Sequence, residues 1–165
     1  MLFRDGRLDR VGRGLYTHPD APVSENHPFA LVAKRVPESV ICLLSALRFH
    51  ELTTQLPNAT WIAVPSKARL PVVSETPLQI LRFDKDAFTE GVNFHRLDGV
   101  NVRITNPART VVDCFKYRKR VGRDVAVEAL RDAMNQRKAT LRDLIRYAKL
   151  RKVSKVMQPY LEFYQ

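Results

Sequence analysis

Few side chains in this sequence have the types and spacing that catalysis or metal binding requires. Histidine and cysteine are common metal ligands and nucleophiles, and the chain carries them at His18, His27, His50, His95, Cys42 and Cys114. The histidines lie far apart, and the cysteines lack the Cys-x-x-Cys spacing of a zinc site. The sequence also contains no glycine-rich phosphate loop and no nucleophile elbow. We therefore predict no catalytic residue, no metal ion and no cofactor.

Three further positions allow both a catalytic and a structural interpretation, and the structural one is favoured at each. Asp84-Lys85-Asp86 comes nearest to the acids and lysine of a metal-dependent nuclease, but a turn after a strand is the commoner origin of such a motif. Asp113 follows Arg109 by four residues in a predicted helix, which favours an ion pair, a weak one if it is exposed. His50 ends a predicted helix, where a cation is stabilised, and we expect it to cap that helix.

The strongest functional signal is the distribution of charge. The formal net charge is +11, and residues 116–155 hold 14 Lys and Arg against 4 Asp and Glu, a net charge of +10. A folded region with such an excess creates a positive potential that attracts a polyanion such as nucleic acid. We therefore favour a nucleic-acid-binding surface over a charged face that is only solvated. An anionic membrane surface is disfavoured, because no segment has a large apolar face with Trp or Phe anchors.

We predict that arginines and lysines contact phosphate groups. Only Tyr117 and Tyr147 interleave with the cations of the basic block, so stacking of single-stranded bases is only weakly supported. The candidate contacts in the basic block are Arg118, Lys119, Arg120, Arg123, Arg137, Lys138, Arg142, Arg146, Lys149, Arg151 and Lys152. Near the N-terminus, basic residues recur at every third position, and these further candidates are Arg4, Arg7, Arg10 and Arg13.

The elements that must position these residues indicate an α+β protein. Residues 1–17 read as the end of a helix and two short strands that turn at Gly12-Arg13-Gly14. Residues 26–105 are rich in strands, expected at 61–64, 78–83, 92–96 and 100–104, with the last two joined in a hairpin. Helices are expected before them, over 29–33 and from Pro37 through His50, where Val40, Leu43, Leu44 and Leu47 share a face.

Residues 106–165 are predicted to be helical. Asn106 caps a helix over 107–117, a second helix spans 122–136, and Thr140 caps a third. The expected inner residues of these helices are Val111, Val112, Phe115, Ala126, Leu130, Ala133, Met134, Leu141, Leu144, Ile145 and Ala148. Ser154 is the expected cap of a last helix, which Pro159 kinks or delays.

Length and cysteine usage complete this picture. A chain of 165 residues suits one domain, or one domain with a small appendage. Cys42 and Cys114 lie among apolar neighbours in predicted helices, so two buried thiols in a reducing compartment are favoured over a disulfide. Neither a signal peptide nor an apolar run of the ~18–20 residues needed to span a membrane is visible, and a cytoplasmic protein is expected.

Five segments of the chain together resemble the AbiEi family of bacterial antitoxins. They are residues 43–53 (LLSALRFHELT), 61–65 (WIAVP), 105–117 (TNPARTVVDCFKY), 124–132 (DVAVEALRD) and 156–161 (VMQPYL). The resemblance implies a type IV toxin–antitoxin system linked to abortive infection by phage. It implies a winged helix-turn-helix that represses the operon by binding DNA. It also implies a C-terminal domain, here residues 26–165, that counteracts a nucleotidyltransferase-like toxin without a stable complex.

Residues 10–16 (RVGRGLY) of this chain resemble the wing hairpin of the family, so residues 1–20 correspond to a remnant of the winged helix. The helices that precede it in the family are missing here, which means either that the true start lies upstream or that specific DNA reading is lost. Two alternatives to the antitoxin come from other classes. One is a stand-alone, sequence-tolerant nucleic-acid-binding module, and the other is a degenerate metal-dependent nuclease that uses Asp113 or Asp84.

Overall fold

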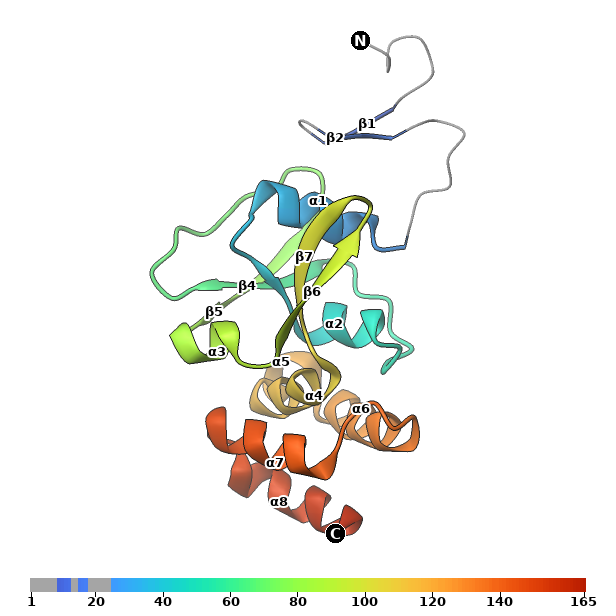
Figure 1. Ribbon diagram of the computed structural model, residues 1–165, viewed down its shortest axis with the longest axis vertical. Coiled ribbons are helices and arrows are strands. Elements are labelled where there is room, and N and C mark those ends of the chain that lie inside the picture. Colours follow the sequence, from blue (N-terminus) through green and yellow to red (C-terminus); the bar gives the residue numbers. More distant parts are fainter. Residues whose placement is uncertain (1–8, 13–14, 18–24) are drawn as a thin grey trace.

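The computed structural model describes residues 9–12, 15–17 and 25–165 (Figure 1). Two short strands, β1 (Asp9–Gly12) and β2 (Leu15–Thr17), form an antiparallel pair in which Arg10 faces Tyr16 across the ladder. This pair matches the predicted hairpin. The helix end expected over residues 1–7 lies outside the described residues. Arg4, Arg7 and Arg13 also lie outside them.

A mixed sheet forms the first layer of the described residues. Its strands lie in the order β5-β4-β3-β7-β6. They are β3 (Val40–Ile41), β4 (Thr60–Pro65), β5 (Leu78–Phe83), β6 (Val92–Leu97) and β7 (Val100–Thr105). Neighbouring strands run parallel in the pairs β4–β5 and β3–β7 and antiparallel in β3–β4 and β6–β7. The four predicted strands and the hairpin between the last two are confirmed, and the fold is of the α+β class.

The predicted helix from Pro37 through His50 is wrong in its first half. Val40 and Ile41 form β3 at the centre of the sheet, and the helix α2 spans only Leu43–Phe49. Val40 pairs with Ala63 on one side and Arg103 on the other, so its backbone is bonded to strands distant in sequence. At Leu43 the backbone has φ 47°, which separates strand from helix. Because β3 and α2 are both buried, their apolar residues together have the spacing of one helical face.

The sheet separates two apolar clusters. Successive residues of β4 alternate between them, with Ile62 and Val64 in one and Trp61 and Ala63 in the other, as the period of a strand requires. Helix α1 (His27–Arg35), which confirms the predicted short helix, covers the first cluster. The second cluster lies between the sheet, α2 and the C-terminal helices, so the strand-rich and helical halves share one core.

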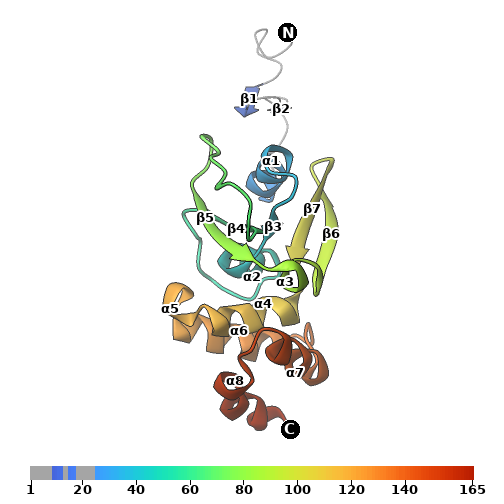
Figure 2. The same cartoon turned by 90° about the vertical axis from the view of Figure 1, so that its left-hand side faces the viewer.

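The second layer consists of the C-terminal helices (Figures 1 and 2). They are α4 (Pro107–Lys116), α5 (Arg118–Val121), α6 (Arg123–Asn135), α7 (Leu141–Leu150), α8 (Ser154–Leu161) and a 3-10 turn, η2 (Glu162–Tyr164). Asn106 and Thr140 cap their helices as predicted, since their side chains accept the backbone N–H groups of Arg109 and Asp143. The short α5 was not predicted, and Gly122 at φ 101° divides it from α6. None of the helices in the described ranges is long and apolar enough to cross a membrane.

Two details of these helices differ from the predictions. Ser154 is the first residue of α8 rather than its cap, and the capping position belongs to Val153, whose side chain makes no capping bond. Ile145, expected on the inner face of α7, is 45% exposed. Both predicted thiols, by contrast, are buried and free. Burial raises the pKa of Cys42 and of Cys114, so both remain protonated at neutral pH.

Candidate nucleic-acid interface

Most of the cations predicted to contact phosphate are exposed. The exposed members are Lys119, Arg120, Arg123, Arg137, Lys138, Arg142, Arg146, Lys149 and Lys152, while Arg118 is half-buried. Arg10 lies in β1. One member of the predicted set is buried, and the exposed ones are distributed over more than one side of the helical layer.

The buried member is Arg151, and its assignment as a phosphate contact is wrong. Its side chain is 6% exposed, and its Nε donates to Oδ1 of Asp113 at 2.8 Å. Arg151 lies seven residues after Leu144 and three after Ala148, so it continues the buried face of α7. That helical phase was readable in the sequence and would have excluded Arg151 from the surface set.

Asp113 joins Arg151 to a second buried cation, Arg109. The Nε of Arg109 donates to Oδ2 of Asp113 at 3.0 Å, and both side chains are fully buried. Both guanidinium groups also stack on Phe83, with their carbons 5.1 Å (Arg109) and 4.8 Å (Arg151) from the ring centre. The predicted i, i+4 ion pair is thus confirmed, but it lies in the core, not at the surface. We call Arg109, Asp113 and Arg151 the buried ion cluster.

The buried ion cluster bears on the nuclease alternative. The carboxylate of Asp113 is enclosed and accepts hydrogen bonds from two guanidinium groups, which compete with any metal for its oxygens. Asp84 caps the short helix α3 (Lys85–Thr89) by accepting the N–H of Ala87, so a helix begins where a turn was predicted, and the structural interpretation of Asp84 stands. Within the described ranges no three His, Cys, Asp or Glu side chains form a group that could hold a metal ion. The geometry therefore gives no support to cleavage by these acids.

His50 also differs from its prediction. It occupies the C-cap position of α2, but its Nε2–H donates to the carbonyl oxygen of Thr105 on β7 at 2.7 Å. Burial lowers the pKa of His50, which favours the neutral ring. The ring lies 6.5 Å from that of His95, whose pKa burial also lowers. His50 therefore connects helix to sheet as a neutral donor and does not act as a cation at a helix end.

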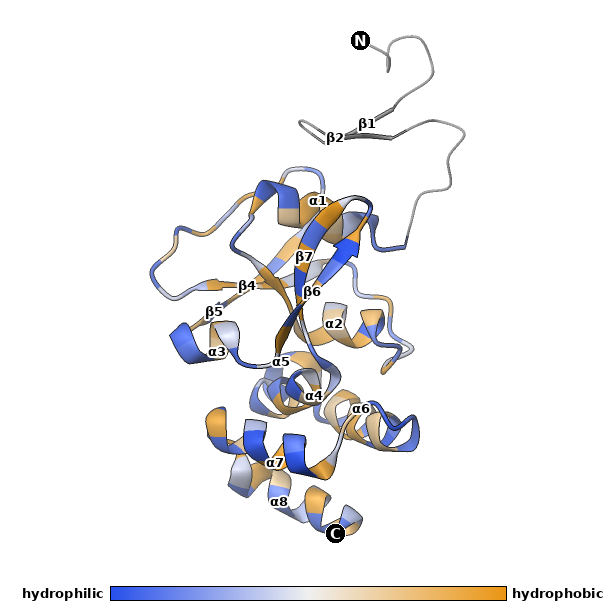
Figure 3. Cartoon of the chain, viewed as in Figure 1, coloured by the Kyte–Doolittle hydropathy of each residue, from blue (hydrophilic) through white to orange (hydrophobic). Residues whose placement is uncertain are grey.

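The outward face of α7 carries a row of cations. Arg142, Arg146 and Lys149 lie at i, i+4 and i+7, and all three are exposed. In Figure 3 hydrophilic and hydrophobic stretches alternate along α7, as expected for an amphipathic helix. Arg146 lies 4.6 Å from the ring centre of Tyr147 and 4.0 Å from the carboxylate oxygens of Glu90 and Asp143, so its charge is partly balanced.

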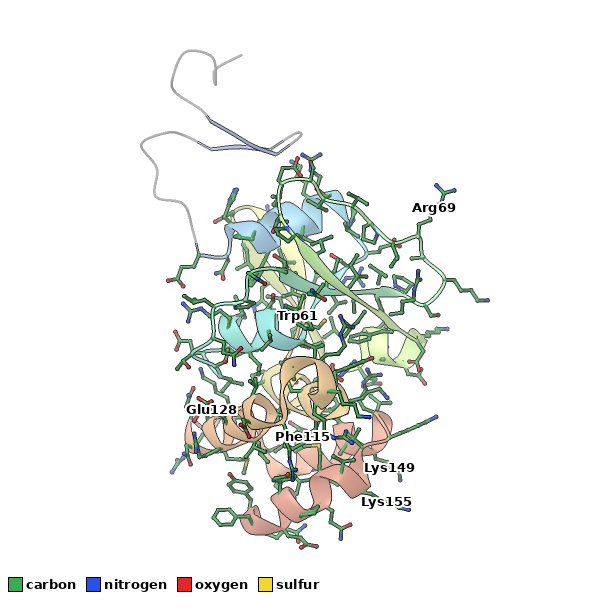
Figure 4. The ribbon with its side chains drawn as sticks, turned by 180° about the vertical axis from the view of Figure 1, so that it is seen from behind. Trp61, Arg69, Phe115, Glu128, Lys149 and Lys155 are labelled. Carbon is green, nitrogen blue, oxygen red and sulfur yellow. The ribbon has the colours of Figure 1, made fainter. Side chains whose placement is uncertain are left out.

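A second group of cations lies where the C-terminal ends of α4 and α7 meet the start of α8. We call its members the lysine edge; they are Lys116, Lys149, Lys152 and Lys155. In Figure 4 Lys149 and Lys155 lie on one side of the helical layer, and Glu128 lies on the opposite side. Within residues 25–165 no carboxylate forms an ion pair with any of these four lysines.

Lys116 is the half-buried member of the lysine edge. Its Nζ donates to the carbonyl oxygen of Arg151 at 3.2 Å. Its pKa is lowered, first by burial and then by the positive charge of Arg151, while Asp113 and Asp84 oppose this shift. Lys116 and Lys155 were not among the predicted contacts, although both lie inside the basic block whose excess charge indicated the site.

The cations of α5 lie apart from those of α7. Figure 2 shows the two helices at opposite sides of the helical layer. Arg120 stacks on Trp61, 5.4 Å from its ring centre, and donates to Gln79, which fixes α5 against the sheet. Arg123 donates to the Tyr160 hydroxyl at 2.7 Å. The structure therefore divides the single predicted surface into an α7 face with the lysine edge, and a separate α5 side.

The last pair of predicted contacts lies in the turn between α6 and α7. Arg137 has φ 57° there, and the Nζ of Lys138 donates to the carbonyl oxygen of His50. Lys138 therefore fastens the turn to the end of α2, whereas the Arg137 guanidinium forms no hydrogen bond or ion pair within the described part of the chain.

A scan against protein-family models found no model that matches the chain, and a search of curated proteins found no matching sequence.

Proposed function

We propose that this protein is a non-enzymatic DNA-binding regulator that contacts duplex phosphates through the outward face of α7 and the lysine edge. The observation that carries the proposal is that Lys149, Lys152 and Lys155 of the lysine edge are exposed and form no ion pair with a carboxylate of residues 25–165. An exposed cation that is not paired within its own fold keeps its full charge for an external anion. The buried ion cluster is excluded from this role because its charges face one another.

The dimensions of α7 suit a duplex. Arg142 and Lys149 are seven residues apart, which corresponds to ~10 Å along a helix axis. Because duplex DNA carries one negative charge per ~1.7 Å of its axis, roughly six phosphate charges occur over that length. The lysine edge continues the row of cations beyond the C-terminal end of α7. Several phosphates of one duplex can therefore be contacted together.

The biological role within this proposal rests on the sequence resemblance. Residues 43–53, 105–117 and 156–161 resemble segments of AbiEi antitoxins, which implies a cytoplasmic antitoxin of a type IV system that represses its operon. Its functional antagonist is then a nucleotidyltransferase-like toxin, with no stable complex between the two. Co-expression tests this role: growth arrest by a nucleotidyltransferase encoded beside this gene should be relieved by the protein, and persistent arrest argues against the antitoxin.

The contact surface is tested by fluorescence anisotropy with its own upstream DNA and a scrambled duplex, over a series of salt concentrations. One variant replaces Lys149, Lys152 and Lys155 with Gln. Its matched control replaces three exposed cations of the sheet layer with Gln, namely Lys34, Lys67 and Arg96. Each variant removes the same charge, but we expect only the first to flatten the dependence of log K on log salt concentration, by about 3.

Three results would separate the alternatives. Preference for its own upstream DNA supports a sequence-reading repressor. Equal, salt-sensitive binding to both duplexes supports the sequence-tolerant module, which uses the same surface without reading bases. Equal effects of the two triple variants on the salt dependence would contradict the assignment of the surface itself.

A further inference from the structure

Two adjoining cavities lie between α6 and α8, on the part of the helical layer that the duplex surface does not use. Their volumes are about 340 and 450 Å³, and both are lined by Pro159 and Tyr160. They adjoin along α8, and we call the two together the groove; its first half extends to Arg118 and Arg123 and its second half extends to Phe163. Cavities of this size lie in the range that binds small planar ligands or parts of larger ones.

Aromatic rings are concentrated along this groove. Tyr160 lies at its middle and packs against Phe115, with 5.2 Å between ring centres. Phe163 lines the second half together with Tyr164, and its ring is 83% exposed. The two rings of the second half meet edge to face, with 5.2 Å between their centres. A phenylalanine ring that is this exposed and held beside a cavity offers a flat apolar surface for stacking.

The cations of the first half keep their charge. Arg118 donates to the backbone carbonyl of Phe115 at 2.9 Å, and Arg123 donates to the Tyr160 hydroxyl from Nε at 3.0 Å and from Nη2 at 2.7 Å. These acceptors are neutral, so the bonds orient the guanidinium groups without cancelling them. In the second half Arg131 lies 3.8 Å from the carboxylate of Asp132 and is partly balanced.

We propose that the groove between α6 and α8 binds single-stranded nucleic acid, with bases stacked on Phe163 and Tyr160 and phosphates beside Arg118 and Arg123. The first half of the groove supplies two guanidinium groups, and its middle and second half supply exposed rings, so the groove offers contacts for both the anionic phosphates and the flat bases of a single strand. The N-terminal turn of α8 carries Lys155 of the lysine edge, and the same helix continues into the groove. An unpaired strand that leaves a bound duplex can therefore enter the groove directly.

This inference rests on the proposed function, because it assigns a second nucleic-acid surface to a protein proposed to bind DNA. It also shows a signal that the basic block did not contain. Tyr160, Phe163 and Tyr164 follow the last lysine of the block in the sequence, and the packing of α8 places Tyr160 beside Arg123.

The test uses the full-length protein and three fluorescein-labelled probes: a twelve-nucleotide oligothymidine strand, a blunt duplex, and the same duplex with a thymidine overhang. The groove variant is Phe163→Ala, and its matched control is Phe94→Ala, a 71% exposed phenylalanine on β6. Because both rings are exposed, neither change should unfold the protein. We expect Phe163→Ala to weaken binding of the single strand roughly tenfold and to leave the blunt duplex unchanged. Phe94→Ala should alter neither.

The outcomes separate this inference from the proposed function. Binding of the blunt duplex together with no binding of the single strand, or with equal effects of Phe163→Ala and Phe94→Ala, would overturn the groove and leave the duplex surface standing. Loss of duplex binding with retained, Phe163-dependent binding of the single strand would overturn the duplex surface alone. If no probe binds, both fail. A fluorescent acidic peptide that contains leucine and phenylalanine serves as a competitor class, and its binding in place of the single strand would assign the groove to a protein partner instead.

Discussion

Replacing Asp113 with Asn should destabilise the protein more than any exposed charge change. Asp113 is the one acid that forms an ion pair with either Arg109 or Arg151 in the described residues, and all three side chains are buried. Asparagine keeps the shape of the side chain but removes its charge. The variant then encloses two positive charges, both stacked on Phe83, with no negative charge between them.

The magnitude follows from the cost of leaving a buried charge without its partner, which is about 3–5 kcal/mol. The backbone carbonyls of Ala87 and Glu90 also accept hydrogen bonds from Arg109, so that guanidinium retains some stabilisation and the lower end of the range is expected. Whole domains are stable by only about 5–15 kcal/mol, so the loss is a large part of the total.

Urea unfolding followed by circular dichroism measures this loss. With a typical slope of about 2 kcal/mol per molar urea, a loss at the lower end of this range should reduce the midpoint by roughly 1.5 M. The control is Asp124→Asn, an exposed acid in the first turn of α6, which should cost less than about 1 kcal/mol. If Asp113→Asn costs no more than Asp124→Asn, the interpretation of Asp113 as the counter-charge of two buried cations is refuted.

Two further predictions concern backbone space and protonation. Gly91→Ala should destabilise the protein by at least ~1 kcal/mol more than Gly99→Ala. Both glycines have positive φ, but a Cβ added at Gly91 would lie 2.8 Å from Cβ of Arg109, whereas a Cβ added at Gly99 would have no atom within 4 Å. Thermal unfolding of the two variants checks this, and equal losses would contradict it. Because burial lowers the folded-state pKa of His50, the unfolded state binds a proton more readily than the folded state. The neutral His50 ring therefore contributes to the free energy of unfolding fully above the unfolded pKa of about 6.5, and this contribution is lost as pH falls below that value. The urea midpoint should therefore drop between pH ~7.5 and ~5.5, by less in His50→Gln, and an unchanged pH dependence in that variant would exclude His50 as a cause.

Features governed by neighbouring residues were predictable from the sequence. The hairpin between β6 and β7 turns at Asp98 and Gly99, both at positive φ (48° and 78°), which is the turn chemistry that Asp-Gly indicates. The caps at Asn106 and Thr140 likewise depend on residues within one helical turn. In each of these cases the side chain and the backbone it satisfies lie a few positions apart.

The central strand β3 could not be recognised in the same way. It is only two residues long, and the partners of Val40 in the sheet, Ala63 and Arg103, lie far away in the sequence. Nothing within one turn of Val40 distinguishes a strand between two others from the start of a buried apolar helix. The helix prediction failed there because pairing across long stretches of chain overrode the local pattern.

The candidate site shows the same division between local and distant causes. The excess charge of the block was visible in composition, but its separation into an α7 face and an α5 side depends on how the helices pack. The aromatic rings of the proposed groove also reach their positions through packing between distant parts of the chain. Tyr160 meets Arg123 across 37 residues, and this contact brings stacking surfaces to cations that the sequence alone left without them.

Arg151 and Lys152 show why charge counting alone does not define such a surface. They are adjacent cations at the end of α7, yet Arg151 is buried against Asp113 and Lys152 is exposed on the lysine edge. The helical phase decides between them, since Arg151 continues the buried face that Leu144 begins. The ion pair that neutralises Arg151 also fastens the end of α7 to α4, where the four lysines meet. The buried cation Arg151 therefore helps to position the lysines of the proposed duplex surface, and the stability of the buried ion cluster is a condition for that surface rather than a part of it.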